Sequence, residues 1–292
     1  MSPHHTKRDL IGLFKERGLR AKRLLGQSFL IDHNLLEVIC RTAELGGEDV
    51  ALEIGAGTGM LTWHLARAGC RVVAVEIDAD LCKIAREYVG RFDNVRLIHA
   101  DIHGPRKTLN PTVRTALKRV LPGRTLKVVS NLPYCISTDL VLSLVELSLP
   151  VERLVLVVQK EFANRLLARP GTRNYGPLTV LVRAQATVER LRDLAPSVFW
   201  PVPDVTSTLL VIRPDSDRRA QIKRYRRFRS LVQTLFTQRR KAMRRALSSM
   251  PKPRLSAEQA DAALEAADIP PDARPDTLGV RQLIRLAETI PA

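Results

Sequence analysis

Cysteine and long apolar runs are both scarce in this chain of 292 residues. The four cysteines contain no C-x-x-C pair, which argues against a disulfide framework and against a thiolate zinc site. No uninterrupted run of about 18 apolar residues occurs, so the sequence predicts no transmembrane helix. The N-terminal stretch also lacks the apolar segment and the cleavage site of a secretory signal, and we therefore expect a cytoplasmic location.

Acidic residues are outnumbered overall and are missing from one long segment. The chain has 47 Lys and Arg against 30 Asp and Glu, which gives a net charge of +17. Residues 218–245 include twelve basic side chains and no acidic one. A solvated helix face is the ordinary interpretation of a charged run, but a run with no compensating carboxylate favours a phosphate-contacting surface. The charge favours a nucleic acid first and an anionic membrane surface second, and we predict a nucleic-acid partner and no membrane.

Apolar runs alternate with amphipathic stretches through the first two thirds of the chain. Strands are expected in VALEIGAG, RVVAVEID, VRLIHAD, KVVSNLPY and LVLVVQKE, which begin at residues 50, 71, 95, 127 and 154. These runs are rich in Val, Ile and Leu on both faces, as in a parallel sheet that is covered by helices on each side. The pattern therefore predicts an α/β fold of the Rossmann-like class.

The pattern changes after Leu191. Residues 193–214 contain four prolines and one more strand-like run, STLLVIRP, and a helical pattern follows from about Asp217. Helices are expected near residues 222–249, 256–268 and 278–290. The predicted domains are a Rossmann-like domain over residues 1–215, with a basic N-terminal extension over 1–23, and a small basic α-helical domain over 216–292.

The sequence EIGAGTG, residues 53–59, lies between the first of these strands and a helix. Glycines at positions 55, 57 and 59 let the backbone approach a ligand closely. The next strand ends in Glu76, 21 residues after Gly55, where a carboxylate can accept both hydroxyls of a ribose. This spacing fits a dinucleotide and also S-adenosylmethionine (SAM).

Two details favour SAM over a dinucleotide. The loop has no glycine at the position that lets a pyrophosphate sit on the helix N-terminus. A third strand is expected to end in Asp101, whose carboxylate can bond an adenine amino group. His99 and His103 flank Asp101, but the sequence offers no fourth ligand, and no metal site is predicted.

The segment VVSNLPYCIS, residues 128–137, ends another expected strand beside the predicted cofactor crevice. An exocyclic base nitrogen is a poor nucleophile because its lone pair is conjugated with the ring. The side-chain oxygen of Asn131 and the carbonyl of Leu132 can accept its two N–H groups and thereby aim the lone pair at a sulfonium methyl. Pro133 has no N–H to compete, and Tyr134 offers a face on which an extruded base can stack. We prefer this catalytic interpretation to a plain strand-to-helix turn.

In their order along the chain, these motifs resemble those of the KsgA family of small-subunit rRNA adenine N6-dimethyltransferases. The likeness covers nearly the whole chain. The family's motifs appear as LLGQSFLID, EIGAGTG, VEID, NLPYCIS, QKEFANRLLARPGTRNYGPLTVL, PSVFWPVPDVTS, FTQRRKAMRRAL and RPDTLGVRQLIRLA.

The resemblance implies a reaction and a set of site residues. The reaction is SAM-dependent dimethylation of N6 on two adjacent adenosines in the 3′-terminal stem-loop of small-subunit rRNA, inside an assembling subunit, by a protein expected to be a monomer. The implied SAM-binding residues are Gln27, Ser28, Leu30, Gly55, Ala56, Gly57, Gly59, Glu76, Ile77, Asp101, Ile102 and Asn131. The implied catalytic residues are Asn131, Leu132, Pro133 and Tyr134. The RNA contacts predicted from the basic run are Arg226, Arg227, Arg239, Arg240, Lys241, Arg244 and Arg245. The domain over residues 1–215 is therefore expected to bind SAM and transfer the methyl group, and the domain over 216–292 is expected to bind RNA or the ribosome.

Several positions depart from the family pattern. Ser28 and Cys135 each stand where the family usually has Asn, and Ala56 and Thr58 replace the more common Pro and Leu. Asp204 stands where a Lys is usual, and a carboxylate there is expected to weaken a phosphate contact.

Two other functions remain open from the sequence. Erm-type enzymes share the N-terminal motifs but methylate an adenine of large-subunit rRNA, whereas the basic TQRRKAMRR segment and the late R-P-D-x-L resemble KsgA more. The second alternative is an RNA-binding ribosome-assembly factor with little catalytic duty. The intact glycine loop, Glu76, Asp101 and NLPY favour an active enzyme. The same NLPY turn argues against a DNA adenine methyltransferase, which would usually carry N/D-P-P-Y.

Overall fold

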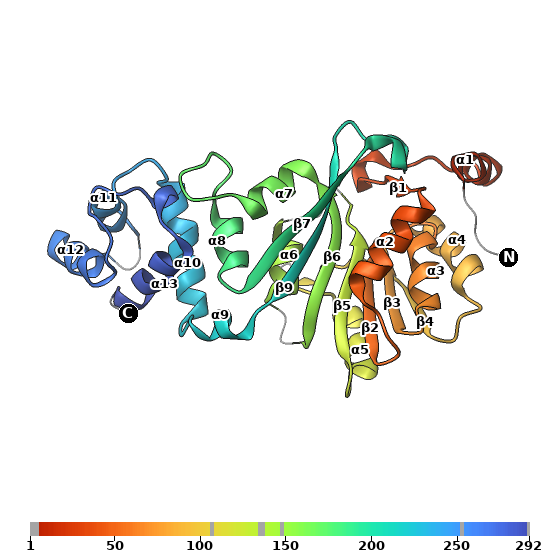
Figure 1. The fold of residues 1–292 in the computed structure, drawn as a ribbon, viewed down its shortest axis with the longest axis horizontal. Coiled ribbons are helices and arrows are strands. Elements are labelled where there is room, and N and C mark those ends of the chain that lie inside the picture. The colour runs from red at the N-terminus through yellow and green to blue at the C-terminus, as the bar shows by residue number, and fades with distance from the viewer. Residues whose placement is uncertain (1–5, 106–107, 134–137, 147–148, 252–253, 291–292) are drawn as a thin grey trace. The chain divides into compact units, whose positions relative to one another are not determined.

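Figure 1 shows the fold in a computed structural model, which describes residues 6–105, 108–133, 138–146, 149–251 and 254–290. The contacts divide the chain into two compact units. Unit 1 comprises Met1–Ala163 and Glu189–Arg213, and unit 2 comprises Asn164–Val188 and Pro214–Ala292. Unit 2 thus takes in a segment before residue 215 as well as the C-terminal helices. The assignment of a SAM-binding role to residues 1–215 and an RNA-binding role to 216–292 stays a prediction.

Unit 1 is built on a central sheet. Its parallel strands are β2 (Asp49–Ile54), β3 (Arg71–Glu76), β4 (Val95–His99), β5 (Thr125–Asn131) and β6 (Val151–Gln159). The strand β9 (Ser207–Pro214) runs antiparallel to β6, and the described strands follow the order β4-β3-β2-β5-β6-β9-β7. Each strand expected from the sequence is present. The chain order reverses between β2 and β5, and in such sheets ligands bind beyond the carboxyl ends of the strands at that point.

One strand of this sheet was missed by the sequence analysis. The strand β7 (Ala186–Leu194) lies at the edge next to β9, and most of its middle residues are exposed. Its sequence, ATVERLRDL, has no apolar run, because an edge strand with little covering over it needs few apolar side chains. Charged residues on such an edge also discourage pairing with other chains.

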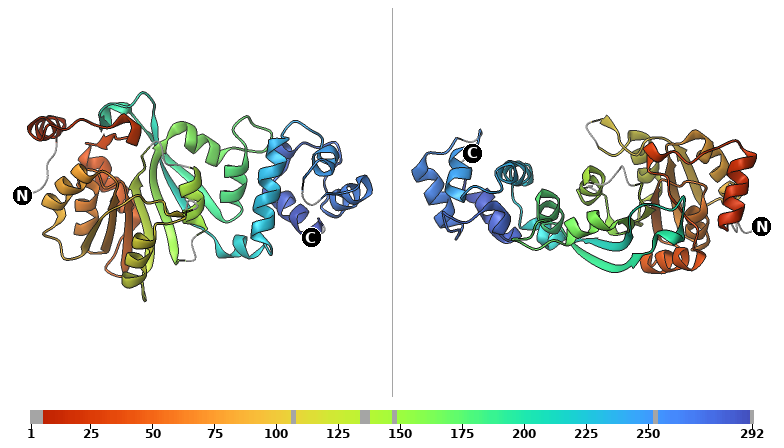
Figure 2. Two further views of the ribbon diagram at one scale, coloured as in Figure 1. Left: turned by 180° about the vertical axis from the view of Figure 1, so that it is seen from behind. Right: turned by 90° about the horizontal axis from the view of Figure 1, so that it is seen from above.

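Helices cover both faces of the sheet, as Figures 1 and 2 show. They are α2 (His33–Ala43), α3 (Met60–Arg67), α4 (Ala79–Val89), α5 (Pro111–Val120) and α6 (Thr138–Val145). The helix α7 (Lys160–Leu167) follows β6 and is divided between the two units. Because both faces are covered, β2 is buried along its whole length and β5 and β6 are buried through most of theirs. No helix in the described ranges is both long and apolar enough to span a bilayer.

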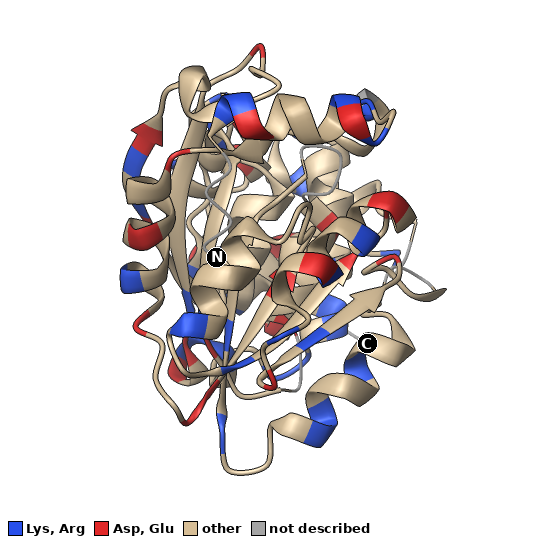
Figure 3. Cartoon of the chain, turned by 90° about the vertical axis from the view of Figure 1, so that its right-hand side faces the viewer, with Lys and Arg blue, Asp and Glu red and all other residues tan. Residues whose placement is uncertain are grey.

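The predicted N-terminal extension forms part of unit 1. It contains α1 (Lys7–Glu16), whose Leu10 and Phe14 pack against Leu81 and Ile84 of α4. A turn of 3-10 helix, η1 (Arg23–Leu25), leads to the short strand β1 (Phe29–Leu30). This strand pairs with β8 (Phe199–Trp200), which directly follows a second such turn, η3 (Pro196–Val198). In Figure 3, positions of basic and acidic residues are interspersed along the helices on this side of the molecule.

Unit 2 is helical. Its elements are α8 (Pro177–Arg183), α9 (Ser216–Ala220), α10 (Tyr225–Thr237), α11 (Met243–Ser248), α12 (Ala257–Ala266), η4 (Pro275–Thr277) and α13 (Val280–Thr289). The expectation of a single helix over 222–249 was wrong, because the helix is interrupted between α10, which ends at Thr237, and α11, which begins at Met243. There the N–H groups of Met243 and Arg244 donate to the carbonyls of Ala273 and Pro271 instead of continuing α10. A tertiary contact of this kind leaves no local signal in the sequence.

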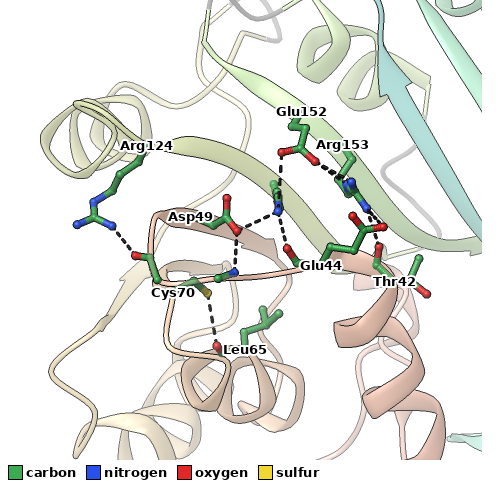
Figure 4. A network of polar contacts seen from close by, with 11 residues as sticks. Thr42, Glu44, Asp49, Leu65, Cys70, Arg124, Glu152 and Arg153 are labelled. Carbon is green, nitrogen blue, oxygen red and sulfur yellow. Dashed lines mark hydrogen bonds and ion pairs between the residues drawn. The ribbon is translucent and has the colours of Figure 1, made fainter.

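An ionic network around the buried side chains of Asp49, Lys127 and Arg153 joins the amino ends of three strands (Figure 4). Lys127 of β5 lies 2.9 Å from Asp49 of β2 and donates to the carbonyl of Glu44. Arg153 of β6 pairs with Glu44 at 2.6 Å and with Glu152 at 2.7 Å. The network lies at the opposite end of the strands from their carboxyl ends, so we assign it to stability.

Replacing Lys127 by Met is expected to lower the free energy of unfolding by about 3–5 kcal/mol, because the Asp49 carboxylate would remain buried without its cation. Urea denaturation measures the change. Lys83→Met is the matched control, since Lys83 is 71% exposed and its loss is expected to cost less than about 1 kcal/mol. Equal effects in the two variants would contradict a stabilising role for the network.

Candidate active site

A cavity of about 240 Å³ lies at the carboxyl ends of β2, β3, β4 and β5, where the chain order reverses. Most of its lining comes from five segments, namely residues 25–30, 53–58, 75–77, 100–103 and 131–133, and Leu36, Met60, Leu61 and Leu81 complete it. Four of these segments were singled out from the sequence as motif positions around EIGAGTG, Glu76, Asp101 and NLPY. The fifth, residues 25–30, falls in the LLGQSFLID motif that the family resemblance identified.

The glycine loop packs closely on its neighbours. Gly55 and Gly57 have φ values of +76° and +59°, which residues with a Cβ rarely adopt. A Cβ on Gly55 would lie 3.1 Å from Pro133, and one on Gly57 would lie 3.2 Å from the ring of Phe29. The loop therefore contacts both the NLPY turn and the LLGQSFLID segment.

Gly59 differs from the other two glycines. It does not line the cavity, although the resemblance implied a SAM contact there. A Cβ on Gly59, whose φ is +87°, would lie 3.2 Å from the backbone of Ala85 in α4. Glycine at this position lets α3 begin close to α4, so helix packing explains why a glycine is required here.

Glu76 ends β3 with its carboxylate held by the backbone. One oxygen accepts the N–H of Gly57 at 2.7 Å and the other accepts the N–H of Asp78 at 2.9 Å. Burial raises the pKa of Glu76 above its ordinary value, and these N–H groups partly oppose that rise. Each carboxylate oxygen still has a further acceptor site, so Glu76 is oriented to receive hydroxyl donors.

Glu53 is a second buried acid in the cavity wall, and its chemistry was missed from the sequence. Its carboxyl group accepts the hydroxyl of Thr62 at 2.5 Å. Burial raises the pKa of Glu53 to about 8, and repulsion from Glu76 adds to the rise. Glu53 therefore holds a proton near neutral pH. The glycine motif gave its position, but only the packing around it sets its protonation.

Two polar atoms in the cavity wall have no hydrogen-bond partner among the described residues. They are the hydroxyl of Thr58 and Nδ1 of His103, and solvent reaches neither. Buried polar groups are nearly always paired in folded proteins, so these atoms fit a site that takes a polar ligand. This observation supports the fit of SAM to the residues present.

Asp101 follows β4, and its surroundings are polar. Its carboxylate accepts the N–H of His103 at 2.8 Å, and its carbonyl accepts the side chain of Asn110. The ring of His99 lies 3.1 Å from the carbonyl of Ile77. The described part of the chain holds no group of three side chains suited to a metal ion.

The NLPY turn begins at the last residue of β5. The side-chain NH2 group of Asn131 donates to the carbonyl of Ser28 at 2.9 Å. This bond uses the nitrogen of the amide and does not involve its oxygen. The N–H of Leu132 donates to the carbonyl of Val157 in β6. Asn131, Leu132 and Pro133 all line the cavity, whereas Tyr134 lies outside the described residues.

The LLGQSFLID segment supplies one wall of the cavity. Gln27, Ser28 and Leu30 all line it, together with Phe29, which the sequence analysis did not name. The hydroxyl of Ser28 donates to the carbonyl of Pro201 at 3.0 Å. The side chain of Ser28, which is shorter than the Asn usual in the family, thus contacts the segment that follows β8. Ile77 and Ile102 also line the cavity, as does Ala56.

The seven predicted RNA contacts differ in their surroundings. Three are engaged within unit 2: Arg239 with Asp276 and the carbonyls of Thr172 and Arg173, Arg244 with Asp261, and Arg227 with the carbonyl of Ile290. Arg226, Arg240, Lys241 and Arg245 are exposed.

Unit 2 holds 21 of the 47 Lys and Arg but only 9 of the 30 Asp and Glu. The excess of positive charge is therefore concentrated there, while Asp204 is an exposed acid of unit 1.

The chain matches the family model for the ribosomal RNA adenine dimethylase over residues 18–289. It belongs to this family. It is 34% identical to the ribosomal RNA small subunit methyltransferase A of Alkaliphilus metalliredigens, over 100% of this chain and 98% of the relative. The protein of the same name from Caldanaerobacter subterraneus is 36% identical, over 93% and 98%. The predicted family and the predicted class of enzyme, an rRNA adenine dimethyltransferase, are confirmed.

Solved structures show the same fold. A dimethyladenosine transferase from Plasmodium falciparum aligns with a TM-score of 0.71 at 24% identity, over 87% of this chain and 94% of that one. The 23S rRNA methyltransferase ErmE aligns with a TM-score of 0.62 at 27% identity, over 90% and 99%. The predicted Rossmann-like methyltransferase fold is confirmed.

Proposed function

We propose that this protein uses SAM to dimethylate N6 of two adjacent adenosines in the 3′-terminal stem-loop of small-subunit rRNA, in the cytoplasm, during assembly of the subunit. The observation that carries the proposal is that the glycine loop, Glu76 and Asp101 share one cavity with the Asn131–Pro133 turn. The names of the relatives support the small subunit as the substrate.

The cavity offers a distinct partner to each part of SAM. Glu76 is suited to the ribose hydroxyls, because its two oxygens are already oriented by backbone N–H groups. Asp101 is suited to the adenine amino group. When bound, SAM supplies the activated methyl group.

The NLPY turn is suited to hold the target base. The side-chain oxygen of Asn131 and the carbonyl of Leu132 would accept the two N–H groups of the adenine N6. This arrangement favours a more pyramidal nitrogen, whose lone pair is then available for the methyl group. No strong base is required, because the amine loses its proton after the transfer, from a cationic product.

Exposed cations of unit 2 are suited to hold the RNA backbone. Arg240 and Lys241 lie in the break between α10 and α11, and both are exposed. Arg239 beside them is committed to Asp276, so its loss would perturb the fold of unit 2 as well as any RNA contact. The pair 240 and 241 is therefore the cleaner site for mutation.

Reversing the charge of Arg240 and Lys241 together is expected to weaken binding to small subunits and to lower the slope of log K against log salt by about one per lost phosphate contact. Binding is measured by filter retention over a series of salt concentrations. Reversal of Arg114 and Lys118, two exposed cations of α5 in unit 1, makes the same change in net charge and is the control. Equal losses in both double variants would contradict a specific footprint in unit 2.

The substrate is tested by incubating the protein with labelled SAM and under-methylated small subunits, with large subunits in parallel. We expect label in the small subunit alone. Label in the large subunit would instead support an Erm-type activity, for which the similarity to ErmE is the supporting observation. SAM binding with no label in either subunit would favour an assembly factor. Sedimentation of the free protein tests the further proposal that it is a monomer.

A further inference from the structure

The segment between α1 and β1 forms one wall of the cavity and is fixed at both ends. At one end α1 packs on α4, and the side chain of Arg17 makes a two-pronged ion pair with Glu87. At the other end β1 pairs with β8, and the ring of Phe29 packs against Phe14 and Trp200. The wall itself lies between these ends, at residues 25–30.

Asp78 binds the middle of this segment. The residue is 5% exposed and follows Glu76 by two positions. One of its carboxylate oxygens accepts the side-chain N–H of Gln27 at 2.8 Å and lies 2.8 Å from the ammonium of Lys22. The backbone N–H of Lys22 donates in turn to the side-chain oxygen of Gln27 at 2.7 Å. Both ends of the Gln27 amide are therefore used, one by Asp78 and one by Lys22.

The same residue also organises the end of β3 and the start of α4. Its backbone N–H donates to Glu76, and its second carboxylate oxygen caps α4 by accepting the N–H of Asp80 at 3.0 Å. Burial raises the pKa of Asp78, but the contacts with Lys22 and Gln27 outweigh it, so the pKa lies below its ordinary value. Asp78 is thus charged at neutral pH and forms charge-assisted contacts.

We propose that Asp78 is a positioning residue that holds Gln27 and its neighbours against the cavity and thereby sets how long SAM stays bound. The inference rests on the proposed function, because it takes SAM as the ligand. Moving the segment away from the cavity would separate a buried carboxylate from Gln27 and Lys22. Leaving a buried charged group without its hydrogen-bond partners costs free energy, so the segment stays in place against the cavity.

Asp78→Asn tests the proposal with little change of shape. The asparagine keeps an oxygen for the α4 cap but turns an NH2 group toward the donors on Gln27 and Lys22. SAM dissociation, followed by stopped flow, is expected to be about tenfold faster and the Kd about tenfold higher, as for loss of one charge-assisted hydrogen bond. The maximal rate of methyl transfer at saturating SAM is expected to stay near that of the wild type.

A second variant separates positioning from a merely structural role. Lys22→Met removes one of the two side chains that bind Asp78, at a residue that does not line the cavity. SAM dissociation is expected to be about threefold faster, while the melting temperature stays near that of the wild type, because Lys22 is half exposed and an exposed ion pair adds little stability. Glu87→Gln is the control, because Glu87 binds the same segment away from the cavity, and it should leave SAM dissociation unchanged.

Unchanged SAM dissociation in Asp78→Asn would overturn the inference, and so would an equal acceleration of SAM dissociation in Glu87→Gln. In both cases the wild type would still bind SAM, and the proposed function would stand. A wild-type protein that binds no SAM would overturn the cofactor assignment and this inference together.

Discussion

Replacing Asn131 by Ala is expected to lower the rate of methyl transfer by about 100-fold or more, the scale found when one group that stabilises a transition state is removed. The variant would lose the oxygen that accepts an N–H of the target adenine, and nothing at that position could then favour a pyramidal nitrogen. SAM binding is expected to weaken by only a few fold. Single-turnover transfer at saturating SAM, with calorimetry for the cofactor, measures the two effects separately.

Asn131→Asp distinguishes the two ends of the amide. The aspartate keeps an acceptor for the base but loses the N–H that donates to the carbonyl of Ser28. We therefore expect its activity to lie between those of the alanine variant and the wild type. Near-normal formation of dimethyladenosine by Asn131→Ala would contradict the proposed role of the NLPY turn.

Replacing Glu76 by Ala is expected to weaken SAM binding by about 100-fold, because two hydrogen bonds between ribose hydroxyls and a charged acceptor would be lost. The N–H groups of Gly57 and Asp78 would also lose their partner, which loosens the glycine loop. The transfer rate at saturating SAM should change far less than the affinity. Calorimetry with SAM measures the Kd, and thermal melting checks that the variant is folded.

The pH dependence of SAM binding gives Glu76 a second test. Burial holds its pKa above the ordinary value, and a protonated carboxyl group accepts fewer hydroxyl donors. SAM affinity of the wild type should therefore fall as the pH is lowered through that raised pKa. The alanine variant should lack this dependence. Equal affinity in the two proteins across the pH range would refute the ribose role of Glu76.

The main features of the site were predictable because they follow from topology and local pattern. Glu76, Asp101 and Asn131 each lie at or just after the end of an apolar run, and the carboxyl ends of parallel strands meet at one edge of a sheet. The glycine loop needs backbone conformations that favour glycine, so its signal is local too.

Features that depend on contacts between distant segments were not predictable from the sequence. The raised pKa of Glu53 arises from its complete burial. The hydrogen bonds of Arg239 go to Asp276 and to the carbonyls of residues 172 and 173. The break between α10 and α11 is stabilised by carbonyls of residues 271 and 273. A basic run looks the same in sequence whether its cations contact RNA or the protein itself.

The measurement that tests the central claim most directly is the analysis of modified nucleosides in small-subunit rRNA after reaction with the wild-type protein and SAM. Digestion followed by mass spectrometry identifies the product, and fragments of the RNA locate it. We predict N6,N6-dimethyladenosine at two neighbouring positions of the 3′-terminal stem-loop, absent when Asn131→Ala is used instead. Methylation at another site, or a product other than dimethyladenosine, would contradict the account.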